Sequence, residues 1–204
     1  MKEFTGRLRL GFTGAGGTGK GTLAKMVADY ANLTFLPTPL AEIGTRFNMK
    51  DFKDHKTKDD VIAYQFAALH GQIYQEKGLQ LAGLGYVAER TSLDYIPYWA
   101  RKRLSVTAEL NDVYVQTAVK WAIENYTMII YCPPEFFPAD GQTWKERDPK
   151  DQAYTDEVIR GLFVYVQDHV PIVRVKGTPD ERFKQVIAGL EAYVREACPN
   201  LCGK

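Results

Sequence analysis

The chain has 204 residues, of which 45% are hydrophobic and 25% are charged. This composition is typical of a globular domain and excludes a disordered chain. The 26 basic and 25 acidic residues leave a formal net charge of +1. Overall charge therefore predicts neither a nucleic-acid partner nor a membrane partner, and any anion-binding site has to be local.

Cysteine content and hydropathy predict the cellular compartment. The three cysteines, Cys132, Cys198 and Cys202, are odd in number and form no disulfide framework, which is typical of a reducing environment. No apolar run approaches the roughly 20 residues that span a bilayer, and the N-terminus lacks an apolar signal core. We therefore expect no membrane partner and a cytoplasmic protein, in the host cytoplasm if its source is viral.

Short apolar runs alternate with longer amphipathic segments along the chain. This pattern predicts an α/β protein with a doubly wound parallel sheet of about five strands and helices on both faces. No repeat or long linker divides the sequence, so a single domain over residues 1–204 is expected, with its site at the carboxyl ends of the strands. In chain order, the expected elements are a strand at 8–12, a helix at 20–31, a strand at 33–36, a helix at 41–48, a helix capped by Asp59 or Asp60 and running to 76, a strand at 86–88, helices at 92–103 and 107–125, a strand at 128–132, a helix at 152–167, a strand at 172–175 and a helix at 180–196.

A glycine-rich segment, here called the phosphate loop, lies between the first strand and the first helix. Glycine permits positive φ angles and lets backbone N–H groups approach phosphate oxygens closely. The helix that follows adds its free N–H groups, and Lys20 supplies a full charge for the β- and γ-phosphates. We therefore expect ATP to bind here. The residues expected to contact it are Gly14, Gly16, Gly17, Thr18, Gly19, Lys20, Gly21 and Thr22.

From this loop onward the chain resembles the P-loop nucleoside and nucleotide kinases. The usual phosphate loop has Ser or Thr directly after the lysine, whereas here Gly21 intervenes before Thr22; this Lys-Gly-Thr variant is that of adenylate kinase and its relatives. The order of the elements is similar to that of small phage kinases with an AAA domain and of ribosylnicotinamide and thymidylate kinases. The resemblance implies a three-layer P-loop NTPase fold with a lid, and transfer of the γ-phosphoryl group of ATP to a nucleotide or nucleoside.

The end of the third strand carries the second motif, Glu89-Arg90. The resemblance implies that Glu89 orients Mg²⁺ or its waters, and that Arg90 binds an acceptor's phosphate or the migrating phosphoryl group. With Gly21 before it, the hydroxyl of Thr22 is expected to hold Mg²⁺ through water. The alternative is a surface ion pair followed by a Thr/Ser helix cap. Asp94, in the first turn of the next helix, either binds the acceptor or complements the helix dipole.

Three further positions follow from the resemblance. Glu42 lies where relatives place a base for a hydroxyl acceptor, although Glu42 and Arg46 at i, i+4 also fit an ordinary exposed helix pair. Residues 133–150 are rich in proline, glycine and charge and are expected to form a lid, with Arg147 as the preferred cation over the transferring group and Lys145 as the second choice; a solvated loop is the alternative. Thr178 follows the last strand, where relatives pass the chain around adenine.

The acceptor stays open at this stage. Three candidate carboxylates favour a hydroxyl or nucleoside, whereas the Lys-Gly-Thr loop favours a monophosphate. Similar viral kinases phosphorylate 5-hydroxymethyluracil in DNA, for which the basic runs at 50–58 and 101–103 and the aromatic residues Tyr95, Tyr98 and Trp99 are compatible. A regulatory NTPase is a further alternative, although the guanine motif Asn-Lys-x-Asp is missing from the sequence. The oligomeric state is also open, a homodimer included.

Overall fold

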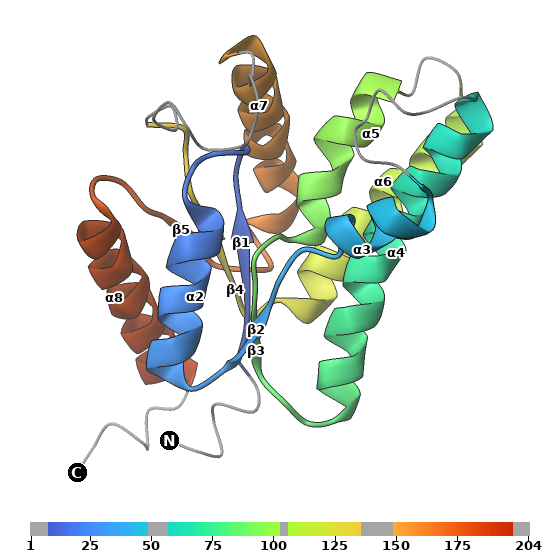
Figure 1. Cartoon of the computed structure of the whole chain (residues 1–204). Helices are drawn as coiled ribbons and strands as arrows, with labels where there is room; N and C mark the ends of the chain where they lie inside the picture. Colours follow the sequence, from blue (N-terminus) through green and yellow to red (C-terminus); the bar gives the residue numbers. More distant parts are fainter. Residues whose placement is uncertain (1–7, 49–56, 103–105, 136–148, 198–204) are drawn as a thin grey trace.

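A five-stranded parallel sheet forms the centre of the protein in the computed structural model, which describes residues 8–48, 57–102, 106–135 and 149–197. The strand order is β2-β3-β1-β4-β5, with every neighbouring pair parallel, so the predicted sheet is confirmed. Figure 1 shows its strands side by side between two groups of helices. The strands are β1 (Arg9–Thr13), β2 (Thr34–Leu36), β3 (Tyr86–Ala88), β4 (Met128–Tyr131) and β5 (Ile172–Arg174).

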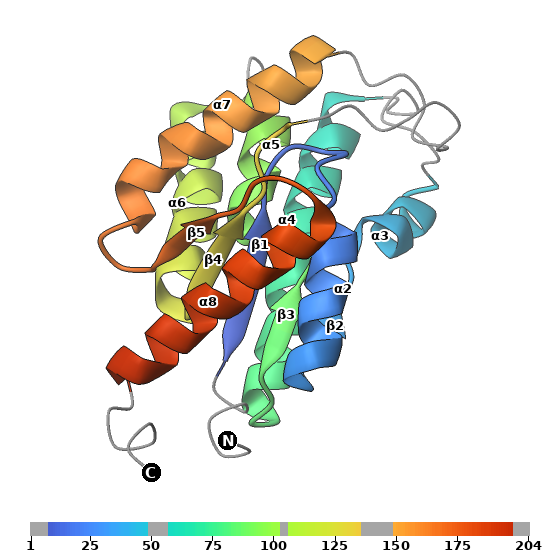
Figure 2. The same cartoon turned by 90° about the vertical axis from the view of Figure 1, so that its left-hand side faces the viewer.

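Helices cover both faces of the sheet, as predicted. Helices α2 and α8 pack together on one face, and α4, α5, α6 and α7 lie on the other (Figures 1 and 2). This is the three-layer α/β architecture that the sequence predicts. In the described part of the chain the helices are α2 (Lys20–Ala31), α3 (Leu40–Arg46), α4 (Lys58–Leu81), the 3-10 helix η2 (Ser92–Tyr95), α5 (Ile96–Lys102), α6 (Ala108–Asn125), α7 (Pro149–Val166) and α8 (Pro179–Ala197).

Each face of the sheet has its own hydrophobic core. Leu10 and Phe12 of β1 are fully buried against α2 and α8. On the opposite face, Trp99 stacks on Tyr114 with ring centroids 4.2 Å apart, and Phe66 packs edge-on against both. Central parallel strands are covered on both sides, which explains why their sequences are almost continuously apolar. Together the two cores fix the positions of the strand ends that carry the site.

Several helix bounds differ from the sequence prediction; for example, α4 runs to Leu81 instead of 76, and α7 begins at Pro149 instead of 152. Helix α4 begins at Lys58, because Thr57 is its N-cap instead of the expected Asp59 or Asp60. The Asp60 amide donates to the Thr57 hydroxyl and the Thr57 amide donates to Asp60, which is a capping box. The helix expected at 92–103 begins instead as the 3-10 helix η2 before α5. Pro97 has no N–H to donate to the Leu93 carbonyl, so the α-helical hydrogen bonding cannot begin earlier.

All five strands run in the same direction, so their carboxyl ends meet at one edge of the sheet. The phosphate loop follows β1 there, and Glu89 and Arg90 follow β3 at the same edge. Ligands of open α/β sheets bind at this edge. Among the helices of the described ranges, none combines the length and the apolar character needed to cross a membrane.

Candidate active site at the phosphate loop

The phosphate loop is a tight turn that only glycine permits at Gly14. Its φ angle is +141°, and a Cβ atom there would lie 2.2 Å from the carbonyl oxygen of Cys132 at the end of β4. Gly17 and Gly19 also have positive φ angles of 82° and 80°. The backbone therefore passes directly over the neighbouring strand and returns into α2 without side chains in the way. This geometry is that of a phosphate cradle.

Lys20 is buried and folds back onto the loop. Its Nζ donates to the carbonyl oxygens of Gly14 and Ala15, at 2.6 Å each. Burial lowers the pKa of Lys20, and the nearby charge of Arg90 lowers it further. A cation in such a place is stabilised strongly by an anion. Two neutral carbonyl oxygens are weaker partners for the ammonium group than an anion would be.

Arg90 adds a second cation beside Lys20. Its guanidinium lies 5.9 Å from the ring centroid of Tyr98, and its Nε is buried without a hydrogen-bond partner among the described residues. Burial lowers the pKa of Arg90, but Tyr98 and Asp94 outweigh burial and the net shift is upward, so the side chain stays charged. The structure thus brings two predicted cations together, with donor capacity left on Arg90.

Asp94 connects the phosphate loop to the segment after β3. One carboxylate oxygen accepts from the amide and the hydroxyl of Thr91, at 2.9 and 2.7 Å, and the other accepts from the Gly14 amide at 3.3 Å. The residue is buried. Asp94 therefore takes part in the cap of η2, as in the alternative in which it serves the start of the helix. It also accepts from the Gly14 amide at the start of the phosphate loop. Both carboxylate oxygens have partners within the protein.

Glu89 explains the unusual glycine after the lysine. A Cβ atom at Gly21 would lie 3.0 Å from Glu89 Oε1, which is closer than an ordinary contact. The other oxygen, Oε2, accepts from the Thr38 amide at 3.1 Å. Glycine at position 21 thus leaves room for the carboxylate beside the first turn of α2. Thr22, by contrast, is exposed on that turn.

The donor set fits a magnesium ion that comes with a nucleotide. The described residues contain no group of three His, Cys, Asp or Glu side chains that could hold a metal by themselves. Mg²⁺ usually keeps several waters and binds through one or two carboxylates plus substrate phosphates. Glu89, next to Gly21 in the phosphate loop, is a carboxylate suited to that arrangement.

A polar network on α4, which the sequence analysis missed, reaches the same site. Gln72 Nε2 donates to the Arg90 carbonyl at 3.1 Å and to Glu76 Oε1 at 2.7 Å, and the Tyr95 hydroxyl donates to Gln72 Oε1 at 3.1 Å. Both Gln72 and Glu76 are fully buried. The sequence signal was a pair of polar residues at i, i+4 on the buried face of a long helix.

Two more side chains missed by the sequence analysis bind the phosphate loop. Gln152 Nε2 of α7 donates to the Gly16 carbonyl at 2.9 Å, and Arg182 Nη1 of α8 donates to the Thr18 carbonyl at 2.8 Å. Both side chains are buried. Their sequence context is an ordinary amphipathic helix, and no motif marks them.

Two predicted site residues, Glu42 and Thr178, make ordinary contacts within their own helices. Glu42 is exposed and pairs with Arg46, which is the ordinary helix pair considered as the alternative. Thr178 caps α8, because its hydroxyl donates to Glu181 at 2.9 Å and accepts from the Glu181 amide at 3.3 Å. Arg147 and Lys145 lie outside the described residues, as does most of the expected lid.

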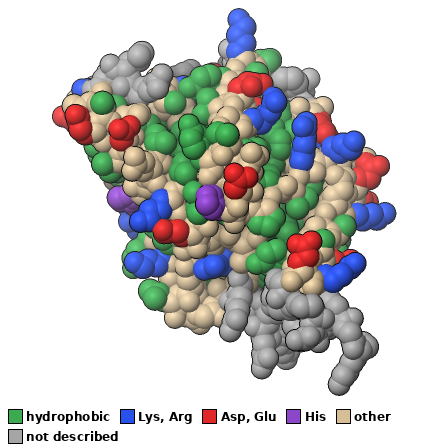
Figure 3. Space-filling view, turned by 180° about the vertical axis from the view of Figure 1, so that it is seen from behind, with side chains coloured by type: hydrophobic (Ala, Val, Ile, Leu, Met, Phe, Trp, Pro, Cys, Tyr) green, Lys and Arg blue, Asp and Glu red, His purple; other side chains and the backbone are tan. Residues whose placement is uncertain are grey.

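The structure corrects two of the three aromatic residues considered for DNA, whereas Tyr98 is half-buried. Tyr95 and Trp99 are both only 1% exposed, so neither can stack on a base; they are core residues that happen to be aromatic. Arg101 of the second basic run is also engaged, since it donates to the Asp151 carbonyl at 2.8 Å. Figure 3 shows the face opposite to that of Figure 1, where basic, acidic and hydrophobic side chains are interspersed.

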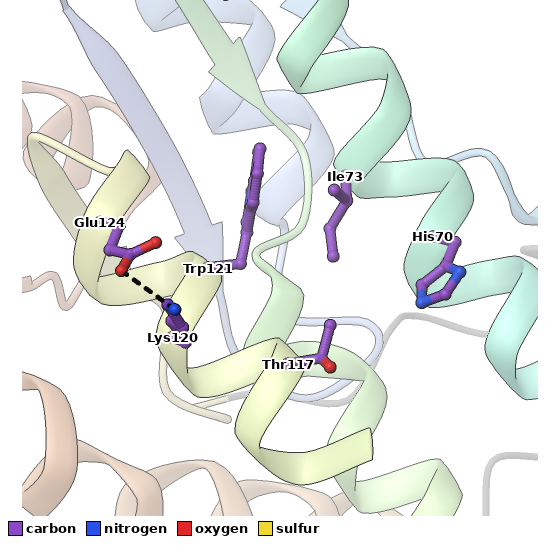
Figure 4. A pocket seen from close by; sticks show the side chains of 6 residues that line it. All are labelled: His70, Ile73, Thr117, Lys120, Trp121 and Glu124. Carbon is purple, nitrogen blue, oxygen red and sulfur yellow. Dashed lines mark ion pairs between the residues drawn. The ribbon is translucent and has the colours of Figure 1, made fainter. Parts of the chain in front are cut away.

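A surface groove of about 400 Å³ between α4 and α6 is not part of this site. His70 and Ile73 come from α4, and the remaining lining residues come from α6 (Figure 4). None of them belongs to the phosphate loop or to the segment after β3. The lining residues are His70, Ile73, Thr117, Lys120, Trp121 and Glu124.

Comparisons with known proteins agree with this geometry. Residues 9–182 match a family model described as an AAA domain, whereas no curated protein matches the sequence significantly. Among solved structures, deoxyadenosine kinase from M. mycoides with bound dATP is 15% identical, with a TM-score of 0.62 over 90% of this chain and 99% of that chain. Thymidylate kinase from Ehrlichia chaffeensis is 13% identical, with a TM-score of 0.61 over 90% and 98%.

A third similar structure is the NadR protein in complex with NR. It is 20% identical, with a TM-score of 0.64, and the match covers 95% of this chain but 54% of the NadR chain. At these identities the likeness establishes the fold.

Proposed function

The chain belongs to the family of AAA-domain proteins matched over residues 9–182, and from this premise we propose that it is an ATP-dependent kinase. It transfers the γ-phosphoryl group to a nucleotide or nucleoside acceptor. The observation that carries the proposal is the phosphate loop, where a buried lysine with a lowered pKa donates to two loop carbonyls beside a second cation. Such a site is stabilised by a polyphosphate.

The loop and Lys20 hold the β- and γ-phosphates of ATP. When the triphosphate enters, Lys20 exchanges the carbonyl oxygens of Gly14 and Ala15 for phosphate oxygens, because an ionic partner is much stronger. The loop amides then donate to the same oxygens. Because these groups are fixed before the reaction, they stabilise the charge of the transition state without reorganising.

Arg90 and Glu89 act on the transferring group. Arg90 has a buried Nε with unused donor capacity and neutralises charge on the γ-phosphoryl oxygens or on an acceptor phosphate. Mg²⁺, when bound with ATP, supplies further neutralisation of the phosphates. Glu89, which lies beside Gly21, would hold this ion or its waters, and Thr22 would contribute through water. Arg147 is proposed as the lid arginine that adds a further positive charge beside the γ-phosphoryl group, together with Lys20 and Arg90.

The comparisons and the carboxylates of the site support a nucleotide or nucleoside as the proposed acceptor. Deoxyadenosine kinase and thymidylate kinase, which share the fold at 15% and 13% identity, act on a nucleoside and a nucleotide by name. Asp94 has both oxygens engaged, and Glu42 is paired on the surface. Glu89 is therefore the proposed carboxylate nearest the transferring group. The burial of Tyr95 and Trp99 weighs against DNA as the acceptor.

Radiolabelled ATP offered to a panel of acceptors tests the proposal. The panel contains nucleosides, nucleoside monophosphates and DNA with 5-hydroxymethyluracil, and the Lys20→Ala variant serves as the matched control. We expect label transfer to at least one nucleoside or monophosphate, and loss of that transfer in the variant. Transfer of label to the DNA and to no nucleoside or monophosphate would show that the proposed acceptor class is wrong and that the acceptor is DNA. ATP hydrolysis that no acceptor changes would support the regulatory NTPase and overturn the kinase.

A further inference from the structure

Side chains from both faces of the sheet hold the outer carbonyls of the phosphate loop. Gln152 belongs to α7, which packs with α5 and α6, whereas Arg182 belongs to α8, which packs with α2 on the other face. Gln152 donates to the Gly16 oxygen at 2.9 Å and Arg182 to the Thr18 oxygen at 2.8 Å. Their side chains are 6% and 3% exposed, so water does not replace these contacts easily.

A side chain that fixes the carbonyl of one residue also fixes the direction of the next residue's N–H. The peptide bond is planar and trans, so its C=O and its N–H point in opposite directions. Fixing the Gly16 oxygen on one side therefore directs the Gly17 N–H to the other side. In the same way, fixing the Thr18 oxygen directs the Gly19 N–H. Gly17 is half-buried and Gly19 is exposed, so a ligand can reach both.

These two glycines need such fixing more than other residues. Both have positive φ angles, 82° at Gly17 and 80° at Gly19, and a glycine backbone samples many conformations at little steric cost. Without an external tie, each peptide plane would rotate and its amide would leave the phosphate. A buried side-chain donor removes that freedom before the ligand arrives, which lowers the entropic cost of binding.

We propose that Gln152 and Arg182 are positioning residues that orient the Gly17 and Gly19 amides toward the phosphates of the nucleotide. This role rests on the proposed ATP site. It means that two residues outside the phosphate loop fix the conformation of the loop. Neither side chain has to touch the ligand. Each acts through one peptide plane.

Arg182 also ties the loop to two neighbouring segments. Its Nε donates to the Gly177 carbonyl at 2.8 Å, and its Nη2 lies 2.9 Å from Glu135 Oε2, which also accepts from the Gly177 amide. Only the planar guanidinium presents several donors in fixed directions. Lysine at this position would keep at most part of the set, so Arg182→Lys retains the charge but loosens the Thr18 carbonyl.

The experiment measures the affinity for two ligands that share only phosphates. ATP and tripolyphosphate, each with Mg²⁺, are titrated calorimetrically into the full-length wild type and into Gln152→Met and Arg182→Lys. Loss of one hydrogen bond predicts affinity about threefold to tenfold weaker for Gln152→Met. For Arg182→Lys the expected loss is tenfold or more. Both ligands should lose affinity by the same factor in each variant.

Gln185→Met is the matched control. Gln185 Nε2 donates to the Lys176 and Glu181 carbonyls at 2.8 and 3.1 Å, so it braces the same turn as Arg182 but makes no contact with the phosphate loop. Its affinity for both ligands should equal that of the wild type. Equal losses in the control would mean that general loosening of the turn explains the effect, and the inference would be wrong.

An amide spectrum distinguishes positioning from general stability. In ¹H–¹⁵N spectra without ligand, Gln152→Met should move the Gly17 resonance and Arg182→Lys the Gly19 resonance, while Gly14, held by Asp94, stays in place. Unchanged affinity in both variants, or weaker ATP binding with unchanged tripolyphosphate binding, would overturn the inference. If Arg182→Lys does not fold, Gln152→Met decides alone. A wild type that binds neither ligand would instead defeat the proposed function.

Discussion

Glu76 gives a prediction in which pH and stability are linked. Its side chain is fully buried, and burial raises the pKa of its carboxyl from 4.5 to about 7 against the opposing effect of hydrogen bonds from Gln72, Trp121, Tyr126 and Tyr86. In the unfolded chain the carboxyl titrates near its ordinary value. Between these two pH values the folded protein holds a proton that the unfolded chain has released.

The direction and size of the effect follow from this difference. A raised pKa stabilises the fold fully below about pH 4.5, and this contribution is lost as the pH rises through about 7. Each unit of difference between the folded and unfolded pKa values corresponds to about 1.4 kcal/mol, so the shift of Glu76 corresponds to about 3 kcal/mol of unfolding free energy. Glu76→Gln replaces the carboxyl by an amide that does not titrate, so the variant should lack this loss.

Urea unfolding of wild type and Glu76→Gln at several pH values between about 5 and about 8 measures how the unfolding free energy of each protein depends on pH. Other titrating groups act equally on both proteins and cancel in the difference. The unfolding free energy of the variant relative to that of wild type should rise by about 2 to 3 kcal/mol across this range. A difference that stays constant with pH would refute the argument that burial, rather than the four hydrogen bonds, dominates at Glu76.

Three further substitutions test separate parts of the site and core. Gly21→Ser restores the common phosphate-loop sequence but places a Cβ atom 3.0 Å from Glu89 Oε1; turnover of ATP should fall by about tenfold or more, and an unchanged rate would show that Glu89 moves away without cost. Trp99→Ala should lower the unfolding free energy by about 3 to 5 kcal/mol in urea, whereas a loss below about 1 kcal/mol would place Trp99 outside the core. Glu42→Gln should leave turnover and stability nearly unchanged, since an exposed pair with Arg46 contributes at most about 1 kcal/mol; a large loss of turnover would restore Glu42 as a catalytic base.

The sequence predicted the sheet well because each strand carries its own signal. Buried parallel strands are apolar throughout, so β3 was placed at its observed bounds and β4 within one residue. The glycines of the phosphate loop are equally local, because a backbone that lies over the Cys132 carbonyl excludes every side chain at Gly14. Local chemistry of this kind is visible without a three-dimensional structure.

The missed residues depend on contacts between distant parts of the chain. Arg182 binds a carbonyl 164 positions earlier, and Gln152 one 136 positions earlier; no short-range pattern encodes either contact. The prediction that Tyr95 and Trp99 stack on a base was wrong for a related reason. An aromatic residue near a site can face the ligand or the core, and only the rotation of α5 and η2 against their neighbours decides between the two.

Binding of ATP to the full-length chain tests the central claim most directly. In a calorimetric titration with Mg²⁺, wild type should bind one ATP per chain, and Lys20→Ala should bind at least about a hundredfold more weakly while unfolding at a similar temperature. Equal affinity in the two proteins, or no binding by wild type, would contradict the assignment of the phosphate loop.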